Sequence, residues 1–444
     1  MSPLSYWARK VYSLLMILGQ PLLRRKLARR GQQEPGYLEA VEERFGHYSQ
    51  PPETASDLVW LHAVSLGEMR TAAMLLKALR AQHPGLRILL THGTATGRAE
   101  GRALLQSGDV QVWQPWDSPA VVARFFSHFK PRLGLLMETE IWPNLVAEAQ
   151  ARAMPLFLVN GRLSGKSLKK ALRVAPLSVP AYGALTAVFA QTAADAARFS
   201  QLGAAVAGVF GNLKFDATPS ASQHAQGKAW RRAVAQPVLM FASSRDGEEE
   251  PFLRQISAVV LKGRLQDAID SVAYAGSKNV RFLIVPRHPQ RFDEVEALVA
   301  QHGLRVSRRS AWGGSPADSD EAMQADVWLG DSLGEMALYY GLSDVALLGG
   351  SFAPLGGQNL IEAAACGCPV VMGPHTFNFA EAAGLAEAEG AALRVADMAE
   401  AVQTALALLG NPPALAAAVA AGLAFAARNR GATARTVGAL RGCL

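Results

Sequence analysis

Short apolar runs alternate with helix-like segments along most of this chain, and that alternation restricts the fold more than any other feature. Five runs in the first half have the length of buried strands: 58–63, 86–91, 133–138, 155–160 and 187–191. Apolar residues at helical spacing lie between them, for example Met69, Leu76 and Leu79. The pattern predicts βαβ units that form a doubly wound parallel sheet.

The second half of the chain repeats this alternation, with strand-like runs at 238–243, 280–286, 327–329, 345–349 and 369–372. Because 444 residues exceed what one hydrophobic core usually supports, we expect two domains. The predicted architecture is two Rossmann-like domains that face a cleft. The predicted divisions are residues 1–30 as a separate segment, a first domain at 31–216, a linker rich in Thr, Pro, Ser, Gln and Gly at 217–236, and a second domain at 237–444 with a helical tail.

The N-terminal segment is apolar and then basic. Residues 11–23 are mostly apolar, and five arginines and lysines follow between Arg24 and Arg30. The apolar part is short for a membrane span, which needs about 20 residues, and no small-residue cleavage site follows it. We therefore expect a membrane-associating helix whose basic flank lies on anionic headgroups at the cytoplasmic face. An uncleaved single-span anchor and a helix packed on its own domain remain as alternatives.

Charge and composition narrow the choice of partners. The formal charge of +7 favours anionic partners, but aromatic residues make up only 7% of the chain and no basic–aromatic platform is evident, so nucleic acid is disfavoured. The three cysteines have neither metal-ligand spacing nor the pattern of a disulfide framework. A reducing compartment fits this cysteine content, and no metal site is expected.

Two glycine pairs, Gly349-Gly350 and Gly356-Gly357, stand between a strand-like run and a helix expected to begin near Asn359. Backbone N–H groups and a helix N-terminus at one place suit a phosphate, and Glu362 would lie one turn along to meet ribose hydroxyls. The alternative is a glycine-rich loop that only makes a tight turn. The G-x-G-x-x-G fingerprint is absent, which counts against a nicotinamide enzyme.

Glu68 follows the first strand and lies in the first turn of the next helix. Ligands of open α/β sheets bind at the carboxyl ends of the strands, which makes Glu68 a candidate general base. The alternative is a capping carboxylate, and the helix N-terminus is expected to keep the pKa of Glu68 low.

Three further candidates lie in the first half of the chain. Glu138 ends another strand, the loop from Thr91 to Arg98 is rich in hydroxyls, and Lys214 lies at the end of the first half. The Thr91–Arg98 loop is either an acceptor site or an ordinary turn.

In the second half, Arg287 and His288 lie in a proline-bounded loop after a strand, which suits a phosphate or a base. The loop from Asp331 to Met336 is a further strand end that leads into a helix.

Together these segments resemble the lipopolysaccharide 3-deoxy-D-manno-octulosonic acid (Kdo) transferases in the right order over nearly the whole chain. The matching stretches are Glu42 to Gly46, His62 to Glu68, Glu138 to Asn144, Gly211 to Asp216, Pro286 to Phe292, Gly349 to Ala364 and Gly373 to Phe379. The resemblance implies a GT-B glycosyltransferase that moves Kdo from CMP-Kdo to a lipid A precursor, with inversion and without a metal or other cofactor. It implies a location at the cytoplasmic face of the inner membrane, in lipopolysaccharide biosynthesis.

The same resemblance assigns roles to individual residues. Glu68 would be the general base, and Glu138 and Lys214 would stabilise the transition state. Glu138 would either offset positive charge on the sugar or orient Lys214. The residues that would contact CMP are Pro286, Arg287, Gly334, Glu335, Met336, Asn359, Leu360, Ile361 and Glu362.

One departure from the family pattern lies between Glu250 and Val280. The chain is longer there than in most members of the family, and we expect a surface insertion. Two other functions compete with this one. The first is another nucleotide-sugar transferase or epimerase of the same fold, which competition between CMP and UDP for binding would distinguish from a Kdo transferase. The second is a non-catalytic envelope scaffold. Retention of Glu68, Lys214 and Arg287 together speaks against a scaffold. No motif reports the number of Kdo units added or the oligomeric state.

Overall fold

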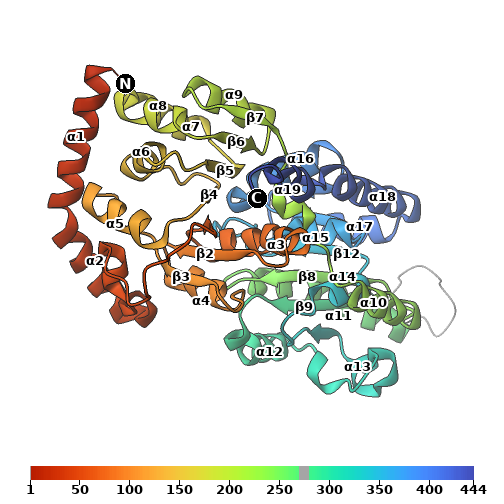
Figure 1. The fold of residues 1–444 in the computed structure, drawn as a ribbon. Helices are drawn as coiled ribbons and strands as arrows, with labels where there is room; N and C mark the ends of the chain where they lie inside the picture. The colour runs from red at the N-terminus through yellow and green to blue at the C-terminus, as the bar shows by residue number, and fades with distance from the viewer. Residues whose placement is uncertain (1, 270–279) are drawn as a thin grey trace. The chain divides into compact units, whose positions relative to one another are not determined.

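The computed structural model describes residues 2–269 and 280–444, without the side chains of residues 262–269. The chain divides into two compact units, Met1–Asp216 with Asn429–Leu444, and Ala217–Arg428. Within the described residues each unit contains one seven-stranded sheet, and every strand pairing is parallel (Figure 1). The structure thus has the two parallel-sheet α/β domains that the alternation predicts. The expected insertion begins in α11 (Glu249–Ile269), and its remainder lies largely outside the described residues.

The first sheet has the order β3 (Val110–Trp113), β2 (Arg87–His92), β1 (Leu58–His62), β4 (Leu133–Met137), β5 (Leu156–Gly161), β6 (Ala187–Ala190) and β7 (Val206–Val209). The helices of this unit are α1 (Pro3–Leu18), α2 (Gln20–Gln33), α3 (Leu66–Gln82), α4 (Ala95–Arg102), α5 (Pro119–Phe129), α6 (Pro143–Ala151), α7 (Gly165–Arg173), α8 (Ala175–Gly183), α9 (Ala193–Gln201) and α19 (Ala432–Leu440).

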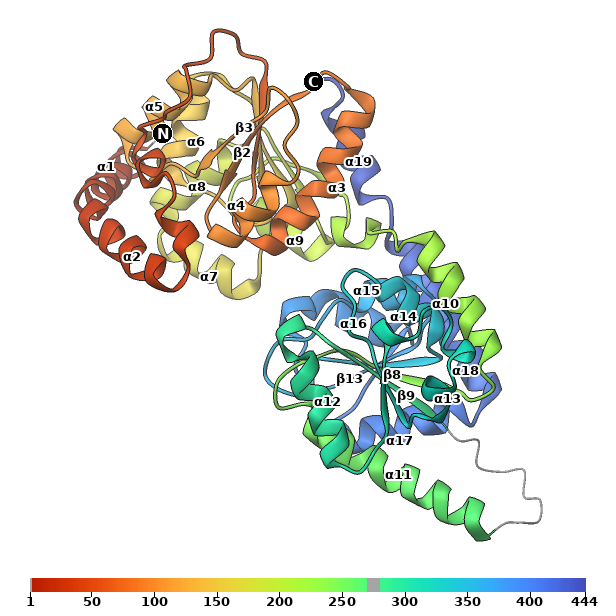
Figure 2. The ribbon, with the colours of Figure 1, turned by 90° about the horizontal axis from the view of Figure 1, so that it is seen from below.

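Strand β1 shows how both faces of this sheet are buried. Leu58 and Trp60 belong to a core cluster that includes α5 and α6, whereas Val59 and Leu61 belong to a second cluster that includes α3 and α19. Figure 2 shows α3 and α19 on one side of the sheet and α5, α6 and α8 on the other. Burial on both faces explains the continuous apolar runs in the sequence, because parallel sheets are covered by helices on each face.

The second sheet has the order β10 (Val306–Arg308), β11 (Val327–Leu329), β9 (Arg281–Pro286), β8 (Val238–Ser244), β12 (Val345–Leu348), β13 (Val370–Met372) and β14 (Ala392–Arg394). Besides α11, its helices are α10 (Ala221–Ala233), α12 (Phe292–Gln301), α13 (Asp320–Gln324), α14 (Met336–Leu342), α15 (Leu360–Ala365), α16 (Ala380–Ala388), α17 (Met398–Leu409) and α18 (Pro412–Asn429).

The first unit runs to Asp216 before the chain enters the second, and the units differ from the expected domains at three places. Residues 217–236, expected as a linker, contain α10, which packs on α14 within the second unit. The tail does not all belong to the second unit, because residues 429–444 join the first, where Val437 and Leu440 of α19 enter the core beside α3. Residues 1–30 are not separate either, since α1 packs on α6 and α8 of the first unit.

The apolar segment 11–23 is not one helix. Helix α1 ends at Leu18, and α2 begins at Gln20 after the capping residue Gly19. Among the helices of the described chain, none alone is long and apolar enough to cross a bilayer. The bent pair Met398–Leu409 with Pro412–Leu440 reaches that length and composition only when the two are joined, across a bend of 106°.

Candidate active site

Glu68 lies in the first turn of α3, and its carboxylate is held by the turn that precedes the helix. The backbone N–H of Val64 donates to Oε2 at 2.9 Å, and the hydroxyl of Ser65 donates to Oε1 at 3.0 Å. Ser65 in turn caps the helix by accepting from the N–H of Glu68. This reciprocal capping box fixes the side chain at the carboxyl end of β1, so the capping role is present in the structure.

The electrostatic environment of Glu68 differs from the sequence-based expectation. The pKa of Glu68 is raised to about 7, mainly by burial and also by the negative charges of Glu138 and Glu140, against hydrogen bonds from Val64 and Ser65 that lower it. The expectation of a low pKa was therefore wrong, because desolvation outweighs the helix N-terminus and the capping hydrogen bonds. A carboxyl that titrates near neutral pH is well matched to accepting a proton from a hydroxyl.

Glu138 and Lys214 are brought together from different parts of the first unit. Glu138 directly follows β4 with a φ of 57°, in the left-handed region, and is 7% exposed. Its Oε1 lies 3.5 Å from Nζ of Lys214, and its Oε2 lies 3.5 Å from Nη2 of Arg162. Both candidates are thus members of one ion-pair group, and the charge of Glu138 also acts on the carboxyl of Glu68.

A chain of side-chain amides at neighbouring strand ends holds the Lys214 segment in place. Asn160, at the end of β5, accepts from the N–H of Leu213 at 3.0 Å. Gln191, directly after β6, accepts from Asn212, and Asn212 accepts from the N–H of Lys214 at 3.0 Å. The sequence reasoning missed these amides and Arg162. The signal for two of them was present, since Asn160 and Gln191 are the last residues of predicted strands.

The Thr91–Arg98 loop supports the Glu68 turn. Thr94 caps α4 and donates its hydroxyl to the carbonyl oxygen of Val64 at 2.9 Å. Arg98 is 9% exposed and pairs with Glu43 at 2.7 Å. These contacts are those of an ordinary capped turn, one of the two interpretations of this loop. The guanidinium of Arg98 is paired with the carboxylate of Glu43.

In the second unit, the residues expected to contact CMP follow the carboxyl ends of three strands. Pro286 and Arg287 follow β9; Gly334, Glu335 and Met336 follow β11; and Asn359 to Glu362 follow β12. These strands lie on both sides of β8 in the sheet order, so their carboxyl ends share one edge. The structure therefore places all nine residues at the edge where ligands of such sheets bind.

Local contacts fix several of these candidates. Glu335 accepts a short hydrogen bond from Ser332 and one from Arg309 at 3.3 Å. Asn359 caps α15 by accepting from the N–H of Ile361 at 3.1 Å, which confirms a helix start at Asn359. Burial raises the pKa of Glu362. A partly desolvated carboxyl of this kind forms strong hydrogen bonds with hydroxyl donors.

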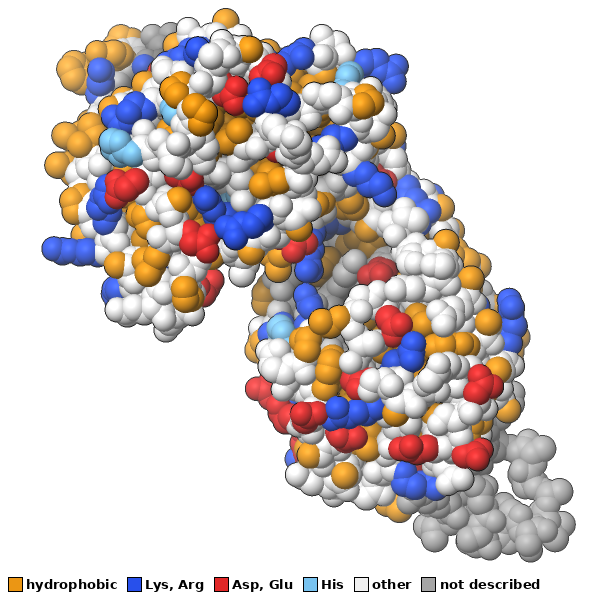
Figure 3. Space-filling view, turned by 60° about the horizontal axis from the view of Figure 1, so that its bottom comes forward, with side chains coloured by type: hydrophobic (Ala, Val, Ile, Leu, Met, Phe, Trp, Pro, Cys, Tyr) orange, Lys and Arg blue, Asp and Glu red, His pale blue; other side chains and the backbone are white. Residues whose placement is uncertain are grey.

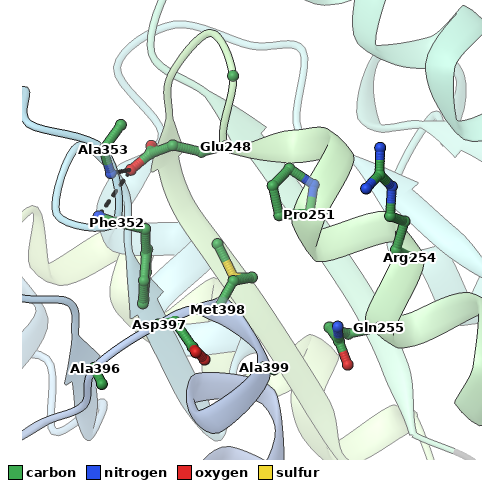
Figure 4. Close-up of a pocket in the computed structure, with 11 residues that line it drawn as sticks. Glu248, Pro251, Arg254, Gln255, Phe352, Ala353, Ala396, Asp397, Met398 and Ala399 are labelled. Carbon is green, nitrogen blue, oxygen red and sulfur yellow. Dashed lines mark hydrogen bonds between the residues drawn. The ribbon is translucent and has the colours of Figure 1, made fainter.

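The first glycine pair has a different role from the predicted phosphate contact. The carboxylate of Glu248 accepts from the N–H groups of Gly350 at 2.7 Å, Phe352 at 3.0 Å and Ala353 at 3.1 Å, and Figure 4 shows the last two bonds. Glu248 is 2% exposed. The prediction that this loop presents free N–H groups to a phosphate is therefore wrong for Gly350, Phe352 and Ala353, because the carboxylate of Glu248 already accepts from these three donors.

Glycine at position 349 has a packing reason. A Cβ atom there would lie 2.2 Å from the carbonyl oxygen of Ser243 on the neighbouring strand end, closer than atoms can approach. The loop from β12 thus passes directly over the end of β8. This close approach lets Glu248, four residues after β8, reach the N–H groups of the loop.

An open hollow of about 340 Å³ lies beside Glu248 and is lined by the start of α11, by Phe352 and Ala353, and by residues 396–399 before and at the start of α17 (Figure 4). It contains none of the residues expected to contact CMP. We therefore place the candidate donor site at the strand ends named above and not in this hollow.

Replacing Glu248 with glutamine should destabilise the protein. The amide keeps the shape but removes the charge and presents an N–H group to backbone donors, so the free energy of unfolding should fall by about 2–4 kcal/mol. Denaturant unfolding of the full chain measures this change. The matched control is Glu250→Gln, which affects solvent-exposed pairs with Arg254 and His302 and should leave stability nearly unchanged. Equal losses in both variants would contradict the role of Glu248.

A group of basic side chains gathers at the carboxyl ends of β8 and β9. The N–H of Arg287 donates to the carbonyl oxygen of Ser244 at 3.0 Å. This bond brings Arg287, directly after β9, close to Arg245, directly after β8. Burial lowers the pKa of His288, and the charges of Arg245, Arg287 and Arg291 lower it further. The charges of these three arginines therefore act together at His288, although Arg291 is also paired with Glu249 and Glu294.

Comparison with known proteins agrees with this architecture. The solved structure of UDP-GlcNAc 2-epimerase from Neisseria meningitidis bound to UDP-GlcNAc aligns over 87% of this chain and 100% of its own, with a TM-score of 0.55 and 14% sequence identity. At that identity the likeness concerns the fold alone. The two parallel-sheet α/β units define a protein that resembles the GT-B glycosyltransferases.

Sequence similarity is more specific. The family model described as 3-deoxy-D-manno-octulosonic-acid transferase (kdotransferase) matches residues 39–217. The 3-deoxy-D-manno-octulosonic acid transferase of Bordetella pertussis is 44% identical over 97% of this chain and 98% of its own, and that of Haemophilus influenzae is 30% identical over 98% of each. The chain belongs to the Kdo transferase family and is a Kdo-transferring glycosyltransferase, which confirms the resemblance found in the sequence.

Proposed function

We propose that this enzyme transfers Kdo from CMP-Kdo to a hydroxyl of a lipid A precursor, with inversion at the anomeric carbon. The observation that carries the proposal is the partly buried Glu68 carboxyl, whose pKa is raised to about 7, on the same unit as the Glu138–Lys214 pair. Family membership and the basic side chains at the carboxyl ends of β8 and β9 support a sugar donor with an anionic leaving group. The residues expected to contact CMP are those at the ends of β9, β11 and β12.

In this mechanism Glu68 removes the proton of the acceptor hydroxyl as the oxygen attacks the anomeric carbon of Kdo, and the bond to the CMP phosphate breaks. The proton ends on Oε1 or Oε2 of Glu68, and the bonding electrons leave with CMP. Lys214 stabilises the negative charge of the donor, which bears both a carboxylate and a phosphate. Glu138 orients Lys214 through the 3.5 Å ion pair, the second of the two roles considered from the sequence.

Competition binding tests the donor assignment directly. CMP should displace a bound fluorescent cytidine nucleotide from the full-length protein, whereas UDP should do so only at much higher concentration. The resemblance implies that no metal takes part, so this preference and the transfer activity should persist in EDTA. Equal displacement by UDP would support the alternative of another nucleotide-sugar enzyme.

We further propose that α1 and α2 bind the cytoplasmic face of the inner membrane. The outward face of α1 and the start of α2 expose large apolar side chains, among them Trp7 at 65%, Leu15 at 57%, Leu18 at 63% and Leu22 at 66%. Lysine and arginine side chains lie beside apolar ones along the edge of the first unit in Figure 3. This combination of apolar and basic groups is that of a helix lying in a membrane interface.

A triple variant Trp7→Ser, Leu15→Ser, Leu18→Ser should bind anionic vesicles at least about 100-fold more weakly, because each side chain contributes roughly 1–2 kcal/mol when buried in the interface. Vesicle sedimentation at two salt concentrations measures the change and its electrostatic part. The control is Leu423→Ser, an exposed leucine of α18. Unchanged binding of the triple variant would contradict the proposal.

A further inference from the structure

The inner face of α1 is polar, the reverse of an ordinary surface helix. Ser13 is 8% exposed, and its hydroxyl lies 2.9 Å from Oδ1 of Asn144 and 2.8 Å from the carbonyl oxygen of Arg9, so its one hydrogen is shared between these two acceptors. Tyr12 donates its hydroxyl to Oδ2 of Asp117 at 2.9 Å. Most large apolar residues of α1 are exposed, and its two buried residues are serines, so hydrogen bonds contribute to its attachment to the unit. Buried polar pairs of this kind specify one geometry, because a displaced partner is left unsatisfied.

The two partners of α1 form one network at the start of α6. Asp117 is 1% exposed, and its carboxylate accepts from the N–H groups of Asn144 at 3.0 Å and Leu145 at 2.8 Å. The side-chain amide of Asn144 donates to the carbonyl oxygen of Asp117 at 2.7 Å. Asp117 thus caps α6 and binds Tyr12 with the same oxygen that accepts from Asn144, so a shift of α1 changes the hydrogen bonds that fix the N-terminus of α6.

The N-terminus of α6 directly follows the catalytic loop 138–142. Trp142 precedes the helix and packs on the core cluster that includes α5 and α6. Its indole N–H donates to Glu140 at 2.9 Å. The charges of Glu138 and Glu140 both raise the pKa of Glu68. The network therefore connects α1, through Asn144 and Trp142, with the carboxylates that surround the candidate base.

We propose that Tyr12, Ser13, Asp117 and Asn144 are positioning residues, through which the membrane-facing helix α1 and the start of α6 hold the loop 138–142 in its catalytic geometry. The inference rests on the proposed function, because it takes this loop as part of the active site. It makes α1 more than an anchor: the same helix presents its outer face to lipid and its inner face to the loop.

Single-residue variants separate this role from membrane attachment. Ser13→Ala should lower kcat about three- to tenfold on an acceptor dispersed in detergent, where vesicle binding plays no part, with little change in KM for the donor. Hydrogen exchange of the amides in residues 138–146 should become faster in the same variant. Tyr12→Phe removes only the hydroxyl that binds Asp117, and it should also lower kcat and speed exchange of these amides. This variant replaces Ser13→Ala if the latter does not fold.

The matched control is Ser5→Ala. Ser5 is also a buried serine of α1, at 9% exposure, but its hydroxyl bonds to Ser2 and not to the loop. It should leave both kcat and exchange at 138–146 unchanged. Unchanged kcat and exchange in Ser13→Ala and Tyr12→Phe, or an equal effect of Ser5→Ala, would overturn the inference. Exchange measured without substrate tests the coupling even if the transfer reaction itself is wrongly assigned.

Discussion

Replacing Glu68 with glutamine should lower kcat about 1,000-fold, within the range that general-base catalysis contributes. Glutamine has nearly the same shape. Its amide oxygen can accept from the N–H of Val64 and its NH2 group can donate to the hydroxyl oxygen of Ser65, so α3 should remain capped. The loss would then report the missing proton acceptor. Steady-state transfer assays measure it, and Glu100→Gln, at a surface ion pair with Arg70, is the control that should retain activity.

The pH dependence provides an independent check on the same residue. Glu68 must be deprotonated to act as a base, and burial raises its pKa to about 7. Activity of the wild type should therefore rise with pH through a midpoint near 7 and should fall as the carboxyl is protonated below it. An ordinary exposed glutamate would give a midpoint near 4 to 5. A profile that stays flat from pH 5 to 8 would contradict the assignment of Glu68 as the base.

The second large effect is expected for Lys214→Met, with a loss in kcat of about 100- to 1,000-fold, as for other groups that stabilise transition-state charge. Methionine keeps much of the side-chain volume and removes the charge. Lys169→Met, at an exposed position of α7, is the control and should be near wild type.

A double variant tests whether Glu138 acts through Lys214. If its main role is to orient the ammonium group, Glu138→Gln combined with Lys214→Met should lose no more activity than Lys214→Met alone. Losses that multiply in the double variant would show that Glu138 contributes separately, for example by offsetting positive charge on the sugar.

The sequence predicts the central strands of both sheets and misses four others. The missed strands β3, β7, β10 and β14 are the outermost strands of the two sheets. They are three or four residues long and only partly buried. An apolar run reveals a strand because both faces are covered by helices, and a short edge strand lacks that cover.

The local motifs place the candidate residues correctly at strand ends, whereas long-range contacts determine their chemistry. The helix N-terminus beside Glu68 is visible in the sequence, but the desolvation and the charges of Glu138 and Glu140 that raise its pKa arise from tertiary packing. Likewise, Gly349 and Gly350 mark a tight loop, but its anion is Glu248, which is 102 residues from Gly350. No local sequence pattern predicts the hydrogen bonds between Glu248 and this loop.

The N-terminus shows the same distinction. An apolar and basic composition favours membrane association, and the exposed outer face of α1 agrees with that proposal. The composition does not reveal that Tyr12 and Ser13 bind Asp117 and Asn144 across more than 100 residues. Two polar residues inside the apolar segment, Tyr12 and Ser13, therefore help to attach it to the first unit.

The most direct test of the account is the mass of the product formed from freshly made CMP-Kdo and a tetraacyl lipid A precursor. Wild type and Glu68→Gln are compared at pH 8, after circular dichroism and CMP binding show that both are folded. The account predicts a precursor whose mass is increased by one or more Kdo units with the wild type, and almost none with the variant. No Kdo adduct from folded wild type that binds CMP, or equal product from both proteins, would contradict it.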